Sequence, residues 1–120
     1  MLVVDASVAV KWLLIEEGRP AAMALLAGGQ PLIAPELVIA EAANVLWKVA
    51  RRGADPAAMR EGMRRLPSLF DRLVPMRGLE AAALDLAIAH GHAAYDCFYV
   101  ALALREGAPL LTADARLATR

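Results

Sequence analysis

Leu2-Val3-Val4-Asp5-Ala6-Ser7-Val8, residues 2–8, is the stretch that decides how this chain is expected to fold. Its first three residues form a short apolar run that ends at an aspartate, a pattern that predicts a buried strand. Apolar residues then recur at helical spacing at Val8, Trp12 and Ile15, and they predict a helix. The chain is therefore expected to begin with a strand that passes directly into a helix.

The rest of the sequence alternates apolar runs with helical patterns, and glycines and prolines separate them. Gly28, Gly53, Gly91 and Gly107 are expected to stop the helices that precede them. The expected strands after the first are Pro31–Pro35, Leu73–Val74 and Pro109–Thr112. The expected helices are Glu17–Ala27, Glu36–Arg52, one that starts at Asp55-Pro56 and ends before Pro67, Leu79–His90, Ala94–Glu106 and a short tail that reaches Arg120.

Strands that alternate with helices predict an α/β fold with a parallel sheet, because parallel neighbours need a crossover connection. In open parallel sheets, ligands bind beyond the carboxyl ends of the strands. Asp5 and Asp114 follow the first and last predicted strands. Both are therefore expected at the edge of the sheet where a ligand would bind.

The composition predicts one globular domain. The chain has 120 residues, of which 59% are hydrophobic and 22% charged. It can bury enough apolar surface to offset the entropy cost of ordering, which excludes intrinsic disorder. Thirteen basic residues balance thirteen acidic ones, so the total charge does not indicate a DNA-coating or polybasic membrane protein. We expect a single domain over residues 1–120.

The cysteine content and the first residues predict a cytoplasmic protein. A lone cysteine, Cys97, cannot form an intramolecular disulfide or a Cys-rich zinc site, which suits a reducing compartment. The chain start has no positively charged segment and reaches Asp5 too early for a signal peptide. The longest uncharged stretch, residues 20–35, is broken by glycines and prolines and is too short to span a bilayer. No membrane association is expected.

Four acidic side chains are candidates for a functional site: Asp5, Glu41, Asp96 and Asp114. The two that follow strands also fit the role of helix N-caps, worth about 1 kcal/mol, and Thr112 competes for that role near the last strand. Asp96 lies in an otherwise apolar first turn, where a carboxylate also interacts favourably with the helix dipole. His92, four residues earlier, is a possible partner for it.

Glu41 is harder to explain as a structural residue. It lies in an apolar helical segment, with no basic residue three or four positions away. A buried, unpaired carboxylate is costly, so Glu41 needs a solvent cleft, a metal or a distant partner, unless it lies on a solvated face. Asn44 lies one helical turn further on the same face. The two side chains are expected to form one wall of a site.

A site that gathered all four carboxylates would need a cation. Each close pair would repel by about 4 kcal/mol at about 4 Å and an effective dielectric of about 20. Only a polyvalent cation, or protonation of some members, makes that arrangement tenable. Oxygen ligands favour Mg²⁺ or Mn²⁺ over zinc, and the sequence has no histidine or cysteine cluster. Such a metal can acidify a water molecule and stabilise the charge that develops in phosphodiester cleavage.

Four segments match a known family in order and spacing across nearly the whole chain: Val3–Ser7, Glu41–Leu46, Tyr95–Ala103 and Leu110–Leu117. They resemble the PIN domain, and within that family the VapC-type toxins of bacterial toxin–antitoxin pairs. The resemblance implies a PIN-like three-layer α/β/α sandwich with a central, mostly parallel sheet of about four strands. It also implies a metal-dependent endoribonuclease that hydrolyses RNA phosphodiester bonds with a metal-activated water.

The resemblance extends to single residues. It implies that Asp5, Glu41, Asp96 and Asp114 are catalytic and hold one or two Mg²⁺ or Mn²⁺ ions. It makes Ser7, Asn44 and Thr112 the polar residues that support these ligands. Six basic residues are candidates to hold the RNA backbone, although they fit a solvated helix face equally well: Lys48, Arg51, Arg52, Arg60, Arg64 and Arg65.

The distribution of charge fits such a site. Residues 48–77 contain eight basic and three acidic residues, a net charge of +5, so the rest of the chain carries −5. If the four proposed ligands are left out, the chain has 13 basic and 9 acidic residues, a net charge of +4. The neutral sum is therefore compatible with an acidic pocket beside a basic flank.

The resemblance further implies a homodimer that a cognate antitoxin neutralises, with an antitoxin arginine placed on the acidic cluster. Four apolar side chains serve such contacts or belong to the core: Trp12, Leu13, Trp47 and Met59.

The sequence departs from the family at two places. The family usually continues past the Asp114 helix into a final edge strand, so a chain that stops at Arg120 is expected to be truncated or to have an incomplete sheet edge. Cys97 stands where alanine is common, and we expect a buried thiol. His90 and His92 match no family role and are expected at helix ends.

Two other functions remain open from the residues. The first is a catalytically inactive PIN-like module that binds RNA or protein. The second is a phosphohydrolase with Asp5 as nucleophile, which needs a second carboxylate beside Asp5 and a catalytic lysine after a late strand. The only lysines are Lys11 and Lys48, and neither follows a late strand.

Overall fold

A four-stranded, entirely parallel sheet forms the centre of the computed structural model, which describes residues 1–113. The strand order is β3-β2-β1-β4, so the first strand lies inside the sheet. The predicted α/β class with a parallel sheet is confirmed. The strands are β1 (Leu2–Val4), β2 (Leu32–Pro35), β3 (Arg72–Val74) and β4 (Leu110–Leu111).

The helices within residues 1–113 lie close to their predicted positions. They are α1 (Ala6–Ala9), α2 (Arg19–Ala27), α3 (Leu37–Arg51), α4 (Pro56–Arg65), α5 (Glu80–His90) and α6 (Ala94–Glu106).

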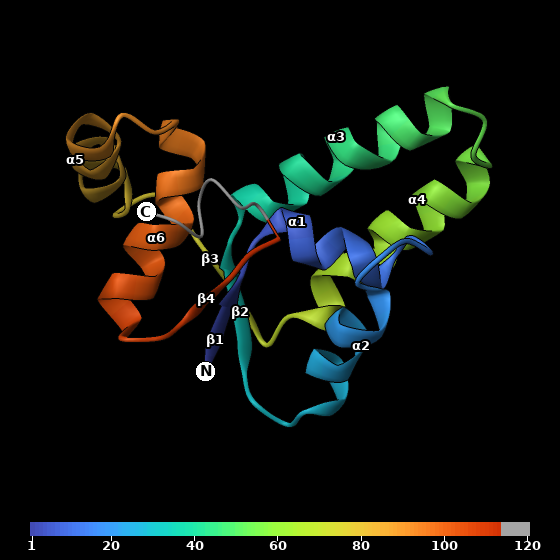
Figure 1. Ribbon diagram of the computed structural model, residues 1–120, viewed down its shortest axis with the longest axis horizontal. Coiled ribbons are helices and arrows are strands. Elements are labelled where there is room, and N and C mark those ends of the chain that lie inside the picture. Colours follow the sequence, from blue (N-terminus) through green and yellow to red (C-terminus); the bar gives the residue numbers. More distant parts are fainter. Residues whose placement is uncertain (114–120) are drawn as a thin grey trace.

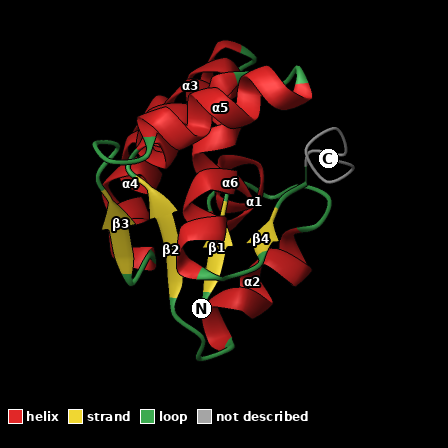
Figure 2. Cartoon of the chain, turned by 90° about the vertical axis from the view of Figure 1, so that its left-hand side faces the viewer, coloured by secondary structure: helices red, strands yellow, loops and turns green. Residues whose placement is uncertain are grey.

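Helices cover both faces of the sheet (Figure 1). α6 packs against β1 and β2 on one face, and α5 packs on α6. Figure 2 shows α6 in front of the strands. α1 and α2 lie on the other face, and α3 and α4 form a helical hairpin that projects beyond the sheet. This is the expected three-layer arrangement.

The helix predicted after the first strand is shorter than its periodicity indicates. α1 tightens into a 3₁₀ turn at Val10–Trp12, and Ile15, expected on a buried helix face, is 94% exposed. The reason lies at Trp12, whose ring centroid is 5.2 Å from that of Phe70 and whose Nε1 donates to the Ala22 carbonyl at 2.8 Å. These contacts bind the chain to the core before another helical turn can form.

Glycines end the later helices as predicted. Gly91 and Gly107 follow α5 and α6 with φ of 61° and 63°, the left-handed conformation that glycine adopts without strain. The same property sets the start of α2. Gly18 has a φ of 88°, so α2 begins at Arg19 rather than near Glu17.

The core lies between the sheet and its helices. Val3, Val4 and Ile33 of the central strands are fully or almost fully buried, and Leu102 of α6 packs against them in the same core cluster. Cys97 is also buried, as predicted. None of the helices in the described residues is long and apolar enough to cross a membrane. The predicted helical tail and Asp114, together with the expectation about the sheet edge after it, lie outside the described residues.

Candidate active site

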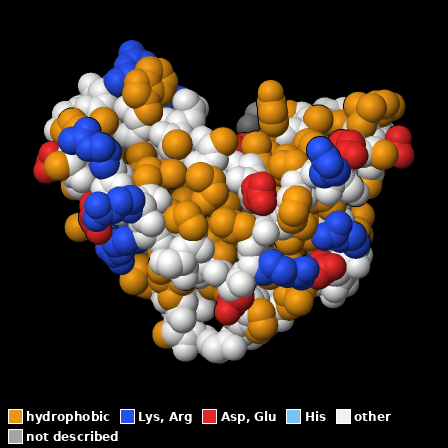
Figure 3. All heavy atoms as spheres, turned by 180° about the vertical axis from the view of Figure 1, so that it is seen from behind, with side chains coloured by type: hydrophobic (Ala, Val, Ile, Leu, Met, Phe, Trp, Pro, Cys, Tyr) orange, Lys and Arg blue, Asp and Glu red, His pale blue; other side chains and the backbone are white. Residues whose placement is uncertain are grey.

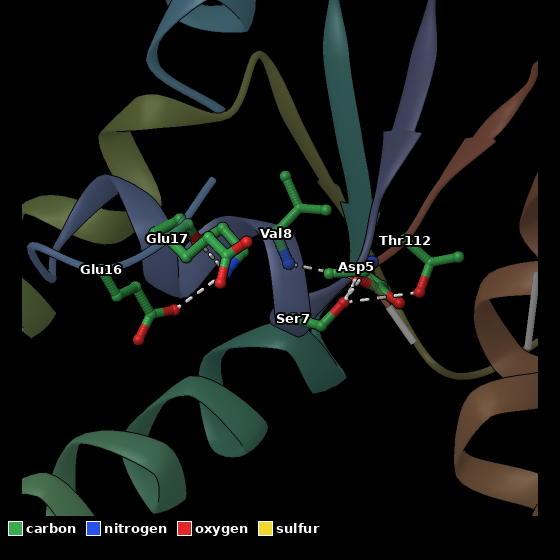
Figure 4. A network of polar contacts seen from close by, with 8 residues as sticks. Asp5, Ser7, Val8, Glu16, Glu17 and Thr112 are labelled. Carbon is green, nitrogen blue, oxygen red and sulfur yellow. Dashed lines mark hydrogen bonds and ion pairs between the residues drawn. The ribbon is translucent and has the colours of Figure 1, made fainter. Parts of the chain in front are cut away.

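Asp5 lies at the carboxyl end of β1 and is the N-cap of α1, so it combines the two roles that the sequence left open. It is only 5% exposed. Its Oδ1 accepts hydrogen bonds from the Ser7 hydroxyl at 2.6 Å and from the backbone N–H of Val8 at 3.3 Å (Figure 4). These donors fix the carboxylate at the edge of the sheet.

Ser7 connects this carboxylate to the end of β4. Its Oγ accepts a hydrogen bond from the backbone N–H of Ala113 at 2.8 Å and lies 3.4 Å from Oγ1 of Thr112. Figure 4 shows Ser7 and Thr112 on either side of Asp5. Two of the three predicted supporting residues therefore gather around Asp5, although they lie 105 positions apart in the chain.

Glu41 of α3 is held in place by a residue of α6. Its Oε1 accepts a hydrogen bond from the Tyr99 hydroxyl at 2.5 Å, which joins α3 to α6. The Tyr99 side chain is 1% exposed, so this bond links the core directly to the site. Glu41 therefore has the distant partner that its apolar surroundings require.

Asp96 lies in the first turn of α6 beside a histidine. Oδ2 of Asp96 is 2.8 Å from Nε2 of His92, the partner that the spacing suggested. His92 lies between α5 and α6, in the short connection after Gly91.

One cavity of about 440 Å³ brings these acidic side chains together. Its lining contains Asp5, Glu41 and Asp96, two predicted supporting residues, and several apolar and aromatic side chains. The full lining is Asp5, Ala6, Ser7, Leu37, Ala40, Glu41, Asn44, Val45, Tyr95, Asp96 and Tyr99. Three of the four predicted carboxylates and Asn44 thus share one cavity.

Burial dominates the electrostatics of this cavity. It raises the pKa of Asp5, while the hydrogen bonds from Ser7, Thr112 and Val8 lower that pKa and only partly offset the effect. Burial also raises the pKa of Glu41, the Tyr99 hydrogen bond lowers it, and the charges of Asp96 and Asp5 raise it further. Burial and Glu41 together raise the pKa of Tyr99, so its hydroxyl stays protonated and donates.

The chemical type of the donors suits a hard divalent cation, but their spacing in the described residues does not form one ligand set. Three carboxylates line the cavity, and carboxylate oxygens are the ligands that Mg²⁺ and Mn²⁺ prefer. In residues 1–113 no three histidine, cysteine or acidic side chains are placed close enough to hold one ion together. Each carboxylate is bound instead to a donor of the protein: Asp5 to Ser7, Glu41 to Tyr99 and Asp96 to His92.

Five of the six basic residues line two different pockets. Lys48, Arg51 and Arg52 line a pocket of about 310 Å³ at the end of α3. Arg60 and Arg64 instead line a separate groove of about 800 Å³ between α3 and α4, and Arg64 forms an ion pair with Glu61. Lys48 is seven residues after Glu41 on α3, so it lies on the helix face that borders the cavity.

The apolar candidates for partner contacts also separate. Trp12 is buried and Leu13 packs against the core. Trp47 is 52% exposed beneath the Arg51 guanidinium, which lies 4.8 Å from the ring centroid, and it lines the groove together with Met59. Hydrophobic side chains gather in a patch on the face that Figure 3 shows, with Lys and Arg side chains around it.

Tyr99 is the site residue that sequence reasoning missed. Its ring lies in the core, but its hydroxyl reaches a carboxylate 58 positions away in the chain. The sequence offered only a general indication of this contact. A buried tyrosine hydroxyl needs a hydrogen-bond partner, and Glu41 lies in an apolar segment with no basic residue three or four positions away.

The fold and the cavity describe a parallel α/β domain with a cluster of carboxylates at the carboxyl edge of its sheet. Comparison with known proteins shows which family has this arrangement. The PIN domain model matches residues 2–120. Ribonuclease VapC3 of Pyrobaculum aerophilum is 36% identical over 124 residues, covering 99% of this chain and 93% of that protein. The chain therefore belongs to the PIN domain family, and within it to the VapC-type ribonucleases.

Solved structures agree with this assignment. PAE2754 from Pyrobaculum aerophilum has a TM-score of 0.79 and 28% identity, and the match covers 98% of this chain and 77% of that one. VapC20 of Mycobacterium tuberculosis, a toxin that cleaves the sarcin–ricin loop, has a TM-score of 0.76 and 21% identity over 99% of this chain and 94% of its own. The second likeness concerns the fold alone.

Replacing Asp5 by asparagine is expected to stabilise the metal-free protein at neutral pH. Because burial raises the folded-state pKa of Asp5, the folded chain holds this proton more tightly than the unfolded chain, and stability falls as pH rises through that pKa. In EDTA, Asp5→Asn should melt at a higher temperature than the wild type near about pH 7.5. The difference should shrink as the pH is lowered through the raised pKa of Asp5.

Thermal melts across this pH range provide the measurement, and Asp85→Asn, which changes an exposed carboxylate on α5, is the control. A neutral-pH melting temperature for Asp5→Asn below that of both other proteins would contradict the burial argument.

Removing the Tyr99 hydroxyl is expected to destabilise the fold. Tyr99→Phe keeps the buried ring but leaves the Glu41 carboxylate without its donor. A hydrogen bond to a charged group contributes about 1.5–3 kcal/mol, so the free energy of unfolding should fall by about that amount in urea denaturation. Tyr95→Phe, at an exposed tyrosine of the same helix, should stay within about 0.5 kcal/mol of the wild type. Equal stability of the two variants would show that the Tyr99–Glu41 bond contributes nothing.

Proposed function

We propose that this chain is the ribonuclease toxin of a toxin–antitoxin pair, and that it hydrolyses RNA in the cavity at the carboxyl edge of the sheet. The single observation that carries the proposal is the shared cavity of Asp5, Glu41 and Asp96 in a chain of the VapC-type family. The cavity that contains the expected acidic residues is therefore the proposed place of RNA hydrolysis.

The residues of the cavity suit a Mg²⁺ or Mn²⁺ site. Asp5, Glu41 and Asp96 are the proposed ligands, and Asp114, which lies outside the described residues, is the proposed fourth. When bound, a divalent cation stabilises the charge that develops on the phosphodiester and makes a water molecule more acidic. The raised pKa values of Asp5 and Glu41 show that their charges are costly without such a cation.

The remaining residues of the cavity orient these carboxylates. Ser7 and Thr112 hold Asp5, and Tyr99 holds Glu41. The Ser7 hydroxyl donates to Asp5, a proposed metal ligand, and accepts from the backbone N–H of Ala113, so both of these hydrogen bonds serve to orient the carboxylate against the end of β4. Hydrolysis by water without a covalent enzyme intermediate fits this arrangement.

The likeness to VapC-type proteins supports two proposed partners besides RNA: a second copy of the chain and a cognate antitoxin. We assign the antitoxin to the α3–α4 groove, where Leu46, Trp47, Met59 and Met63 offer apolar contacts. An exposed tryptophan beside such a groove is a residue type that protein partners commonly bury.

Asp5→Asn and Asp96→Asn should each abolish metal-dependent RNA cleavage. Loss of several kcal/mol of transition-state stabilisation corresponds to a fall of about 1000-fold in cleavage rate with Mg²⁺ or Mn²⁺. Rates on single-stranded RNA are the measurement, circular dichroism checks the fold, and the exposed Asp85→Asn is the matched control. Unchanged activity in both site variants would refute the site.

The same experiment tests the alternative of an inactive PIN-like binding module. That alternative predicts a wild-type protein that cleaves no RNA and gains no thermal stability from Mn²⁺ or Mg²⁺.

Lys48 is expected to contact an RNA phosphate, because it lies on the face of α3 that carries Glu41 and Asn44. Lys48→Ala should weaken RNA binding and make the slope of log affinity against log salt less steep by about 1, whatever the RNA sequence. Arg105→Ala removes one charge at the far end of α6 and should leave both unchanged. Salt titrations of RNA affinity that give equal slopes for the two variants would place Lys48 outside the RNA path.

A further inference from the structure

Tyr95 lines the cavity, but none of the contacts described above for residues 1–113 gives it a role there. It lies in the first turn of α6, next to Asp96, and lines the same cavity as Asp5 and Glu41. Its side chain is 66% exposed, although the ring is one of the larger apolar groups in the chain. Because Tyr95 lines the cavity and leaves most of its side chain uncovered, it is placed where a ligand in the cavity would contact it.

The ring of Tyr95 is available for such a ligand. Within residues 1–113, the ring contacts are those between Trp12 and Phe70 and between Arg51 and Trp47, and neither involves Tyr95. Tyr99, one turn further along α6, behaves differently because its ring is buried and its hydroxyl binds Glu41. The two tyrosines therefore have separate roles, one inside the core and one at the cavity mouth.

The surroundings define what Tyr95 can bind. The opposite wall of the cavity includes Leu37, Ala40 and Val45 of α3, which are apolar, while the carboxylates concentrate negative charge. A flat, uncharged aromatic group fits this setting, and single-stranded RNA presents one at every nucleotide.

We propose that Tyr95 is a base-stacking residue, whose ring stacks on a nucleobase of single-stranded RNA next to the phosphodiester that is cleaved. The proposal rests on the proposed function. Stacking on an aromatic side chain contributes about 1–3 kcal/mol per base and tolerates every base, so Tyr95 positions the RNA strand rather than reading its sequence. Base-paired RNA does not offer this face, so Tyr95 selects unpaired RNA.

The test pairs a change in the protein with a change in the RNA. The substrates are a single-stranded oligoribonucleotide and a series in which one nucleotide near the cleavage point is abasic. With Mn²⁺, Tyr95→Ala should lower kcat/KM on the intact RNA by about 5- to 150-fold, the equivalent of about 1–3 kcal/mol. One abasic position should cost the wild type a similar factor and cost Tyr95→Ala almost nothing further.

Two matched variants complete the design. Tyr95→Phe keeps the ring and should retain the activity of the wild type. Leu104→Ala removes an apolar side chain of nearly equal exposure, 67%, from the same helix and should also behave as the wild type. A second readout does not need turnover: in EDTA, a 2-aminopurine at the position found above should be quenched by the wild type and Tyr95→Phe, and less by Tyr95→Ala.

Three outcomes would overturn the proposal. Tyr95→Ala that cleaves intact RNA as well as the wild type shows that the ring contributes nothing. Equal abasic penalties in the wild type and Tyr95→Ala show that another group contacts the base. In both cases the wild type still cleaves, so the proposed function stands. A wild type that cleaves none of the RNAs would instead overturn the proposed function, and the role of Tyr95 with it.

Discussion

Burial of carboxylates at one edge of the sheet is the constraint on which the rest of this structure depends. Parallel strands bring their carboxyl ends to one edge, and that edge carries Asp5 close to Glu41 and Asp96. Burial raises the pKa of Asp5 and of Glu41, and the charges of Asp96 and Asp5 raise the pKa of Glu41 further. Each of these carboxylates accepts hydrogen bonds from the protein, and the hydroxyls of Ser7 and Tyr99 donate to Asp5 and Glu41. Among residues 1–113, no lysine or arginine lines the cavity, so its lining leaves the carboxylates without a cationic partner of that kind.

The helices that build this cavity also build the core, so folding and function depend on the same elements. α6 buries Leu102 and Tyr99 against the sheet, while its first turn presents Asp96 to the cavity. α3 divides in the same way, because Leu46 faces the core and Glu41 faces the site. Packing in the core and the placement of the carboxylates are therefore linked through the same two helices.

The total charge is neutral, but acidic and basic side chains line separate pockets. The acidic cavity lies where α3 meets the sheet, and the pocket of Lys48, Arg51 and Arg52 lies at the other end of the same helix. One RNA strand that follows α3 would pass from basic side chains to the carboxylates. Arg60 and Arg64 of α4 line a different, largely apolar groove, so the positive charge of residues 48–77 is not gathered in one pocket.

The order of strands and helices, the glycine stops and the position of Asp5 at a strand end followed from the sequence by itself, because backbone preferences and periodicity act over a few residues. Resemblance in four segments added the family and the expected catalytic role of the four acidic residues. Only the tertiary structure decided that Tyr99 holds Glu41, that Ser7 meets the end of β4 and that α1 ends before Ile15. Each of these depends on contacts between distant parts of the chain, and their geometry exists only once the sheet and its helices have packed together.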